Sequence, residues 1–101
     1  MKIENRGTCL RISEITELTA VNSAGFREEV SAALPGAPSL IEIDLAQTRF
    51  VDSSGLGALF ALYRATAQRN GVTLRLLNPR AEIRQLLELT QMQQLFEIAA
   101  G

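Results

Sequence analysis

The sequence contains no histidine, no tryptophan and one lysine, and these absences remove whole classes of chemistry. Without histidine, neither a Ser-His-Asp nor a Cys-His mechanism can form, and a metal site would need carboxylates alone. Lys2 stands too close to the start of the chain to be a convincing catalytic base or Schiff-base residue. The glycines match neither a dinucleotide fingerprint nor a P-loop. We therefore expect no enzymatic activity, no cofactor and no metal.

The cysteine content and the net charge limit the disulfides and the partners that the protein can have. The one cysteine, Cys9, excludes an internal disulfide, and its alternating apolar neighbours indicate a small buried hydrophobe rather than a reactive thiol. Ten basic and eleven acidic residues leave a net charge of −1 without runs of like charge, so nucleic acid and anionic membrane are poor partner candidates. The sequence shows neither a signal peptide nor a membrane-spanning apolar run, so we expect a cytoplasmic protein without membrane insertion.

A chain of 101 residues fits one domain, 1–101, with one core. The predicted strands lie at 3–7, 9–15, 40–45 and 72–77, and the predicted helices lie at 23–34, 54–70 and 79–90. The first two strands can pair as a hairpin, and 16–20 is predicted to be a loop. Helices that alternate with strands imply right-handed crossovers. We predict an α/β fold with a mixed, mostly parallel sheet of four or five strands and three or four helices.

Capping residues mark the helix ends. Asn22 or Ser23 can cap the first helix, and Pro35 with Gly36 ends it. Gly71 is the predicted stop of the second helix. The third helix is predicted to start at 78–79, where asparagine precedes a proline in the first helical position. Residues 91–94 read as a polar turn, and 95–98 is too short to assign between a final strand and part of a terminal helix.

The strand at 40–45 alternates cleanly. Ile41, Ile43 and Leu45 share one face, and Glu42 and Asp44 share the other. The two acids suggest a carboxylate site for a small ligand or nucleotide, but charges on the exposed face of a strand explain them better. A ligand-sensor function therefore has no positive support.

The stretch Phe50-Val-Asp-Ser-Ser-Gly-Leu-Gly57 passes from an apolar strand into a helix through two adjacent hydroxyls. Ser53 follows an acid, and two glycines lie within four positions of it. Such a helix start can hold an anion. The alternative is structural: one of the two serines caps the helix, and the glycines let it approach the sheet closely.

The helix that follows has an ordinary core-facing stripe but an unusual outer face. Its core-facing stripe is predicted to be Leu56, Leu59, Phe60, Tyr63 and Ala67. The residues predicted to point outward are small or apolar as well: Gly57, Ala58, Ala61, Leu62 and Ala65. This outer face is either a docking patch beside the hydroxyls or a surface that another helix covers.

If a partner docks there, phosphorylation of Ser53 would place nearly two negative charges at the rim of the interface, next to Asp52. Within the protein, the helix N-terminus favours the phosphate by roughly 0.3–1 kcal/mol. In the complex, a mispaired buried charge costs about 3–5 kcal/mol. The larger interface effect predicts an intact fold and weaker binding.

The Asp52-Ser-Ser-Gly-Leu-Gly57 stretch after an Ile-Glu-Ile-Asp-Leu strand, together with the order of elements, resembles STAS domains of the anti-sigma factor antagonist family. The resemblance implies a bacterial partner switch. The unphosphorylated antagonist binds an anti-sigma factor that is also a serine kinase and so frees the sigma factor; the kinase phosphorylates the serine, and a phosphatase restores it. The serine that matches is Ser53. The matching recognition surface comprises Asp52, Ser54, Gly55, Leu56 and Gly57, with Glu17 and Leu18 from the loop after the second strand.

One departure from the family lies in that loop. Members commonly carry Gly-Glu-Leu-Asp, whereas this chain has Thr16-Glu-Leu-Thr19. Thr19 removes a carboxylate near the serine, so kinase recognition can differ. This leaves an alternative function: a STAS subunit that docks permanently on a membrane transporter, without a phosphorylation cycle. The predicted partner surface comprises Asp52, Ser54, Gly55, Leu56, Gly57, Ala58, Ala61, Glu17 and Thr19.

Overall fold

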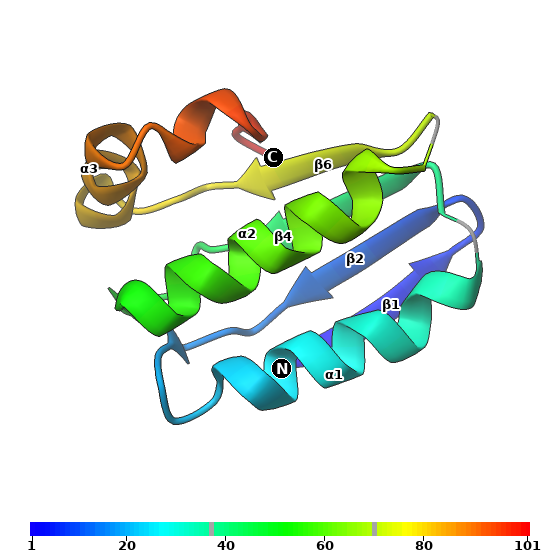
Figure 1. Ribbon diagram of the computed structural model, residues 1–101, viewed down its shortest axis with the longest axis horizontal. Coiled ribbons are helices and arrows are strands. Elements are labelled where there is room, and N and C mark those ends of the chain that lie inside the picture. The colour runs from blue at the N-terminus through cyan, green and yellow to red at the C-terminus, as the bar shows by residue number, and fades with distance from the viewer. Residues whose placement is uncertain (37, 70) are drawn as a thin grey trace.

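The main sheet has five strands in the spatial order β1-β2-β4-β6-β7 (Figure 1). The structure is a computed structural model, which describes residues 1–36, 38–69 and 71–101. The strands are β1 Lys2–Arg6, β2 Cys9–Ser13, β4 Leu40–Asp44, β6 Thr73–Leu77 and β7 Glu97–Ala99. β1 and β2 form the predicted antiparallel hairpin, and the other neighbours are parallel. The prediction of a mixed, mostly parallel sheet is confirmed.

Two residues of the predicted loop at 16–20 form a strand instead. β3 Glu17–Leu18 pairs in parallel with β5 Phe50–Val51 in a separate two-stranded sheet. Leu18 is fully buried. A strand of two residues has no periodicity that a sequence pattern can reveal.

Three α-helices are present in the described part of the chain: α1 Ser23–Ala33, α2 Ser53–Ala67 and α3 Ala81–Leu89. Two short 3₁₀ turns follow α1 and α3: η1 Leu34–Gly36 and η2 Met92–Gln94. α1 and α2 lie side by side across one face of the sheet, whereas α3 lies beyond the end of β6 (Figure 1). Crossovers of this kind join the parallel strands.

The core lies between the sheet and these two helices. Ile41 and Ile43 of β4, and Leu45 after it, have the inward orientation predicted for them, and all three are fully buried. Burial of such a side chain contributes about 1.5–3 kcal/mol. The core residues that they join from the neighbouring elements include Leu10, Ile12, Phe26, Val30, Leu59, Leu62, Leu74 and Leu76.

The opposite face of the sheet carries a row of alternating charges, one from each strand. The row consists of residues in direct register: Glu4, Arg11, Glu42, Arg75 and Glu97. Glu42 lies 3.5 Å from Arg11 and 3.1 Å from Arg75, and Arg75 lies 2.6 Å from Glu97. Arg11 also pairs with Asp44, at 2.9 Å. Glu42 and Asp44 therefore face away from the core, as predicted, but in ion pairs.

Cys9 belongs to this charged face rather than to the core. It is half-buried, and its Sγ donates to Oε1 of Glu42 at 3.5 Å. The prediction that Cys9 is a small buried hydrophobe is therefore wrong. Burial, followed by the Glu42 carboxylate, raises the pKa of the Cys9 thiol, so little thiolate forms at neutral pH.

Two helix starts differ from their predicted form because the asparagine side chains bind elsewhere. Asn22 precedes α1, but its side chain accepts from the Thr19 amide at 2.8 Å and donates to the Glu17 carbonyl at 2.6 Å. Asn78 has φ 53°, and its amide exchanges two hydrogen bonds with Gly101. α3 consequently starts at Ala81, two residues after Pro79.

The remaining boundaries shift slightly. α2 ends at Ala67, before the predicted end at Asn70, which lies outside the described residues. Gly71, the predicted stop, has φ 79°, a conformation that favours glycine. α1 ends at Ala33, and η1 continues it through Leu34 and Pro35. The unassigned tail contains a strand, β7, which starts at Glu97.

Candidate functional site

The start of α2 is capped by Asp52 and not by a serine. Asp52 is extended, with φ −102° and ψ −172°, and its Oδ1 accepts from the Gly55 amide at 3.0 Å. The alternative that a serine caps the helix is therefore wrong, and α2 starts at Ser53, one residue earlier than predicted. Ser53 and Ser54 are both exposed, and in the described part of the chain neither hydroxyl is in a hydrogen bond. Both hydroxyls are therefore accessible to solvent.

Asp52 also ties the start of α2 to the loop before α1. Its second oxygen, Oδ2, accepts from the Ala20 amide at 3.1 Å, across 32 positions of sequence. The hydrogen bonds from Gly55 and then from Ala20 lower the pKa of Asp52. The carboxylate beside Ser53 is therefore charged at neutral pH.

Gly55 and Gly57 have different surroundings. Gly55 is buried, and a Cβ built on it would overlap the backbone carbonyl of Leu18. Gly57 is exposed, and a Cβ there would meet nothing within 4 Å. The structural explanation, close approach of the helix, is correct for Gly55 and wrong for Gly57.

The predicted faces of α2 are partly wrong. Ala58 and Leu62, expected to point outward, are buried, with 1% and 7% exposure. Phe60 and Ala67, expected in the core, are exposed. The cause is α1, which packs beside α2, so that α2 buries a broader face against both the sheet and a helix. The interpretation that another helix covers the small residues holds for these two positions.

The other members of the predicted α2 surface differ in exposure. Leu59 is fully buried, as predicted. Leu56 and Tyr63 are half-buried and pack against the core. Ala61 is half-buried and Ala65 is exposed. Among these residues, Ala61 and Ala65 remain accessible to a partner.

The loop residues Glu17 and Thr19 lie near the start of α2. Glu17 pairs with Phe50, and the bond between Asp52 and Ala20 places Thr19 one residue from that carboxylate. Both residues are half-buried. The structure thus brings together two predicted groups, the loop and the helix start, that lie more than thirty positions apart in sequence.

Exposed apolar residues nearby were missed by sequence reasoning. Val21, in the same loop, is 88% exposed, and Phe50 of β5 is 68% exposed. Phe60 is 42% exposed and stacks on Tyr63, with ring centroids 6.2 Å apart. The sequence held no signal for the two residues in short irregular segments, since periodicity needs longer elements.

The described residues contain no cluster of three or more metal-ligating side chains of the His, Cys, Asp or Glu type. Within the same ranges, no helix is long and apolar enough to cross a membrane. The chemistry that the arrangement offers is that of an exposed serine hydroxyl at a helix N-terminus, where a phosphate is electrostatically tolerated.

Known structures share this architecture. A candidate anti-sigma factor antagonist from Thermotoga maritima superposes with a TM-score of 0.88 at 19% identity, covering 97% of this chain and 84% of that one. The anti-sigma factor antagonist SpoIIAA in its unphosphorylated form gives 0.82 at 24% identity, over 97% and 86%. The phosphorylated form of Bacillus SpoIIAA gives 0.71 at 24% identity, over 97% and 89%. At these identities the likeness concerns the fold.

Comparison of the sequence with curated proteins finds no match. The family model of the STAS domain matches residues 1–100. It covers both the two-stranded sheet and the Ser53 helix start described above. The chain therefore belongs to the STAS domain family.

Proposed function

We propose that residues 1–101 act as one STAS domain, a cytoplasmic, non-enzymatic anti-sigma factor antagonist with a phosphorylation-controlled partner switch. In this proposal, the unphosphorylated form binds an anti-sigma factor that is also a serine kinase. The kinase transfers the terminal phosphoryl group of ATP to Ser53 Oγ, with ADP leaving and the hydroxyl proton released. A serine phosphatase hydrolyses the phosphoester. Phosphorylation releases the partner.

The observation that carries this proposal is that Asp52, and not Ser53, caps α2. Asp52 caps the helix, so the Ser53 hydroxyl is exposed and has no structural role there. A serine that capped the helix would use its Oγ to accept a backbone N–H, and modification of that oxygen would disturb the cap. Here the added phosphate meets the helix N-terminus, which favours it by about 0.3–1 kcal/mol. The fold can therefore tolerate the modification.

The partner surface proposed here surrounds Ser53. It includes Asp52, Ser54, Leu56, Gly57 and Ala61 from α2, with Glu17 and Thr19 from the loop; Gly55 and Ala58 support it from below. A phosphate on Ser53 would be desolvated in the complex next to the charged Asp52 carboxylate. Such an unpaired buried charge costs several kcal/mol, more than the helix dipole contributes.

The test is phosphorylation by a cognate kinase with ATP, followed by site mapping with mass spectrometry. We expect one phosphate, on Ser53, and a ¹⁵N–¹H spectrum that changes only around the start of α2. Ser53→Ala should abolish the incorporation, and Ser54→Ala should retain it. Phosphate at neither serine would contradict the proposal.

The alternative function, permanent docking of this chain on a membrane transporter, predicts a different outcome. Thr19, in place of the family's aspartate, favours this second reading, because it removes a carboxylate from the loop next to Asp52. A permease would then co-purify with the protein, and Ser53→Asp would not displace it. The switch predicts loss of the partner in that variant.

A further inference from the structure

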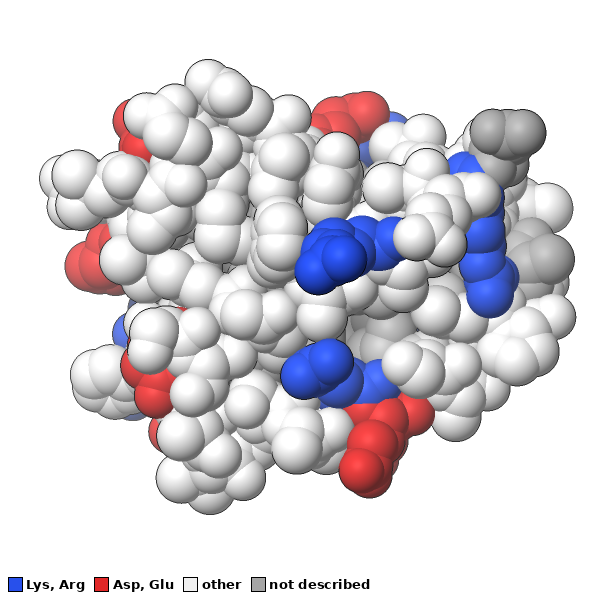
Figure 2. All heavy atoms as spheres, viewed as in Figure 1, with Lys and Arg blue, Asp and Glu red and all other residues white. Residues whose placement is uncertain are grey.

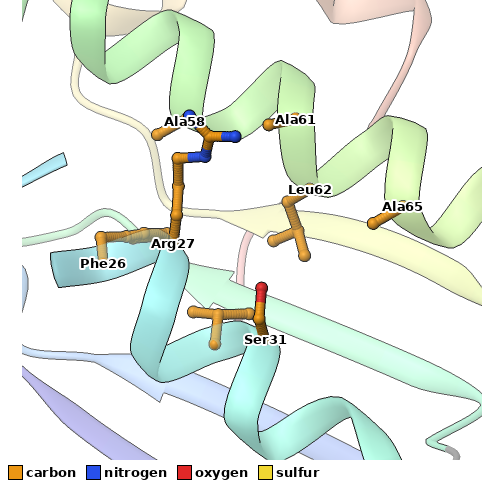
Figure 3. A pocket seen from close by; sticks show the side chains of 8 residues that line it. Phe26, Arg27, Ser31, Ala58, Ala61, Leu62 and Ala65 are labelled. Atoms are coloured by element: carbon orange, nitrogen blue, oxygen red, sulfur yellow. The ribbon is translucent and has the colours of Figure 1, made fainter. Parts of the chain in front are cut away.

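A groove lies between α1 and α2, on the outer side of the molecule, with a cavity of about 140 Å³. In Figure 3, Ala58, Ala61 and Ala65 follow one another along α2 on the side that faces α1, and the Arg27 side chain points from α1 toward α2. The other lining residues are Phe26, Val30, Ser31 and Leu62.

The small side chains of α2 create this groove, and buried apolar residues form its floor. Phe26, Val30 and Leu62 below it are each less than a tenth exposed. A cavity of about 150 Å³ in a protein core admits a benzene-sized group. The groove therefore suits one leucine or phenylalanine side chain, and it is too small for a nucleotide.

One basic residue lines the groove, and the neighbouring helix carries a second. Arg27, the basic residue of α1, lines the groove; Arg64, the basic residue of α2, lies outside the lining, and both are exposed. Among the described residues, neither is in an ion pair. Figure 2 shows basic side chains on both sides of a hollow in this face, with an acidic group directly beside the lower basic one and other acidic groups nearer the margin.

No acidic side chain of the described residues lines the groove itself. α2 contains none, and Glu29 of α1 lines a separate hollow with Met1 and Val21. Glu28 lines that hollow too, and also a second one beside Arg27 and Ser31. The groove is thus apolar in its floor and positive at its rim. Charge complementarity favours a partner segment of opposite charge, in which acidic residues flank one apolar residue.

We infer that this groove receives an apolar anchor side chain from an acidic segment of the partner protein. The inference rests on the proposed function, since the partner is the protein that Ser53 controls. Ala58 follows Ser53 by five residues, roughly 7–8 Å along the helix axis. This axial separation alone is about one Debye length at physiological salt, so in this proposal a phosphate on Ser53 partly repels an acidic segment in the groove.

The test uses two short synthetic peptides with the same central phenylalanine, flanked by glutamates in one and by lysines in the other. Titration into the ¹⁵N-labelled protein at low salt should give roughly tenfold tighter binding of the glutamate peptide. Its amide shifts should concentrate at Ser31, Ala61 and Ala65. Equal affinity of the two peptides, or shifts outside the groove, would overturn the inference.

A matched pair of variants isolates the charges. The double variant Arg27→Gln/Arg64→Gln should weaken the glutamate peptide roughly tenfold. Arg80→Gln/Arg84→Gln, which removes the same net charge from the α3 region, should leave the affinity unchanged. An equal loss in both would mean that only net charge matters and would contradict a groove site. These peptide titrations need no phosphate on Ser53. The groove inference can therefore fail while Ser53 is still phosphorylated, and the groove can bind the peptide even if Ser53 is not phosphorylated.

Discussion

The backbone of Gly55 in α2 packs directly against the carbonyl of Leu18 in β3, leaving no room for a side chain. The same carbonyl accepts a hydrogen bond from the Asp52 amide at 3.2 Å. Together with the bond from Ala20 to Asp52, this contact holds the loop after β2 against the start of α2. The position of the loop relative to Ser53 therefore depends on one glycine.

Replacement of Gly55 by alanine should destabilise the protein. The new Cβ would overlap the Leu18 carbonyl, so α2 must shift away from β3. Overpacking of this kind lowers the free energy of unfolding by about 1–3 kcal/mol. Urea denaturation followed by circular dichroism measures the change. A stability equal to that of the unmodified protein would show that the contact is not restrictive.

Gly57→Ala should have the opposite effect on stability. Gly57 is exposed in a helix and its Cβ position is open, so alanine raises the free energy of unfolding by about 0.5–1 kcal/mol. We also expect weaker partner binding and slower Ser53 phosphorylation, because the methyl group lies one turn from Ser53. Gly25→Ala in α1, also with open space around it, is the matched control for stability without loss of binding.

Acidification should release the loop from α2. The folded-state pKa of Asp52 is lowered, so the stability that its carboxylate contributes is complete above about pH 3.9, the unfolded value. That contribution is lost as the pH falls through the lower folded-state pKa. An NMR titration should show the Ala20 and Gly55 amides shifting together below pH 3.9. In Asp52→Asn neither amide should titrate in this range.

Glu42 should hold the charge row on the open face together. Glu42→Gln removes the carboxylate between Arg11 and Arg75, so stability should fall at low ionic strength, by less than in Gly55→Ala. Molar salt should shrink the difference, since these side chains are partly exposed. Partner binding should be unaffected, because α1 and α2 cover the other face. A salt-independent difference would argue for packing rather than charge.

Glu42→Gln should also change the reactivity of the Cys9 thiol. The Glu42 carboxylate is one of the causes that raise the pKa of Cys9, after burial. Its removal should lower the thiol pKa and speed the reaction of Cys9 with a disulfide reagent at a given pH. Thiol reactivity measured against pH gives this directly. An unchanged profile would leave burial as the sole cause.

Much of the fold could be predicted from the sequence because its elements obey simple periods. The alternation of Ile41 and Ile43 with charged residues marks a strand with one buried face, and helices between such strands require a mainly parallel sheet. The hairpin of β1 and β2 and the start of α2 within one residue follow from the same reasoning.

The remaining features depend on tertiary contacts. β3 has two residues and exists because β5 pairs with it. The burial of Ala58 and the exposure of Phe60 follow from where α1 packs, which no pattern within α2 encodes. Asn78 looks like a helix cap in sequence, but Gly101 at the other end of the chain binds its side chain. Long-range partners decide such cases.

The most direct measurement concerns the complex itself. The protein is co-purified with its bound partner, ATP is added, and both the phosphate and the retained partner are quantified. The account predicts a phosphate on Ser53 together with release of the partner, whereas Ser53→Ala stays bound. Release without phosphate on Ser53, or a phosphorylated Ser53 that still binds the partner, would contradict it.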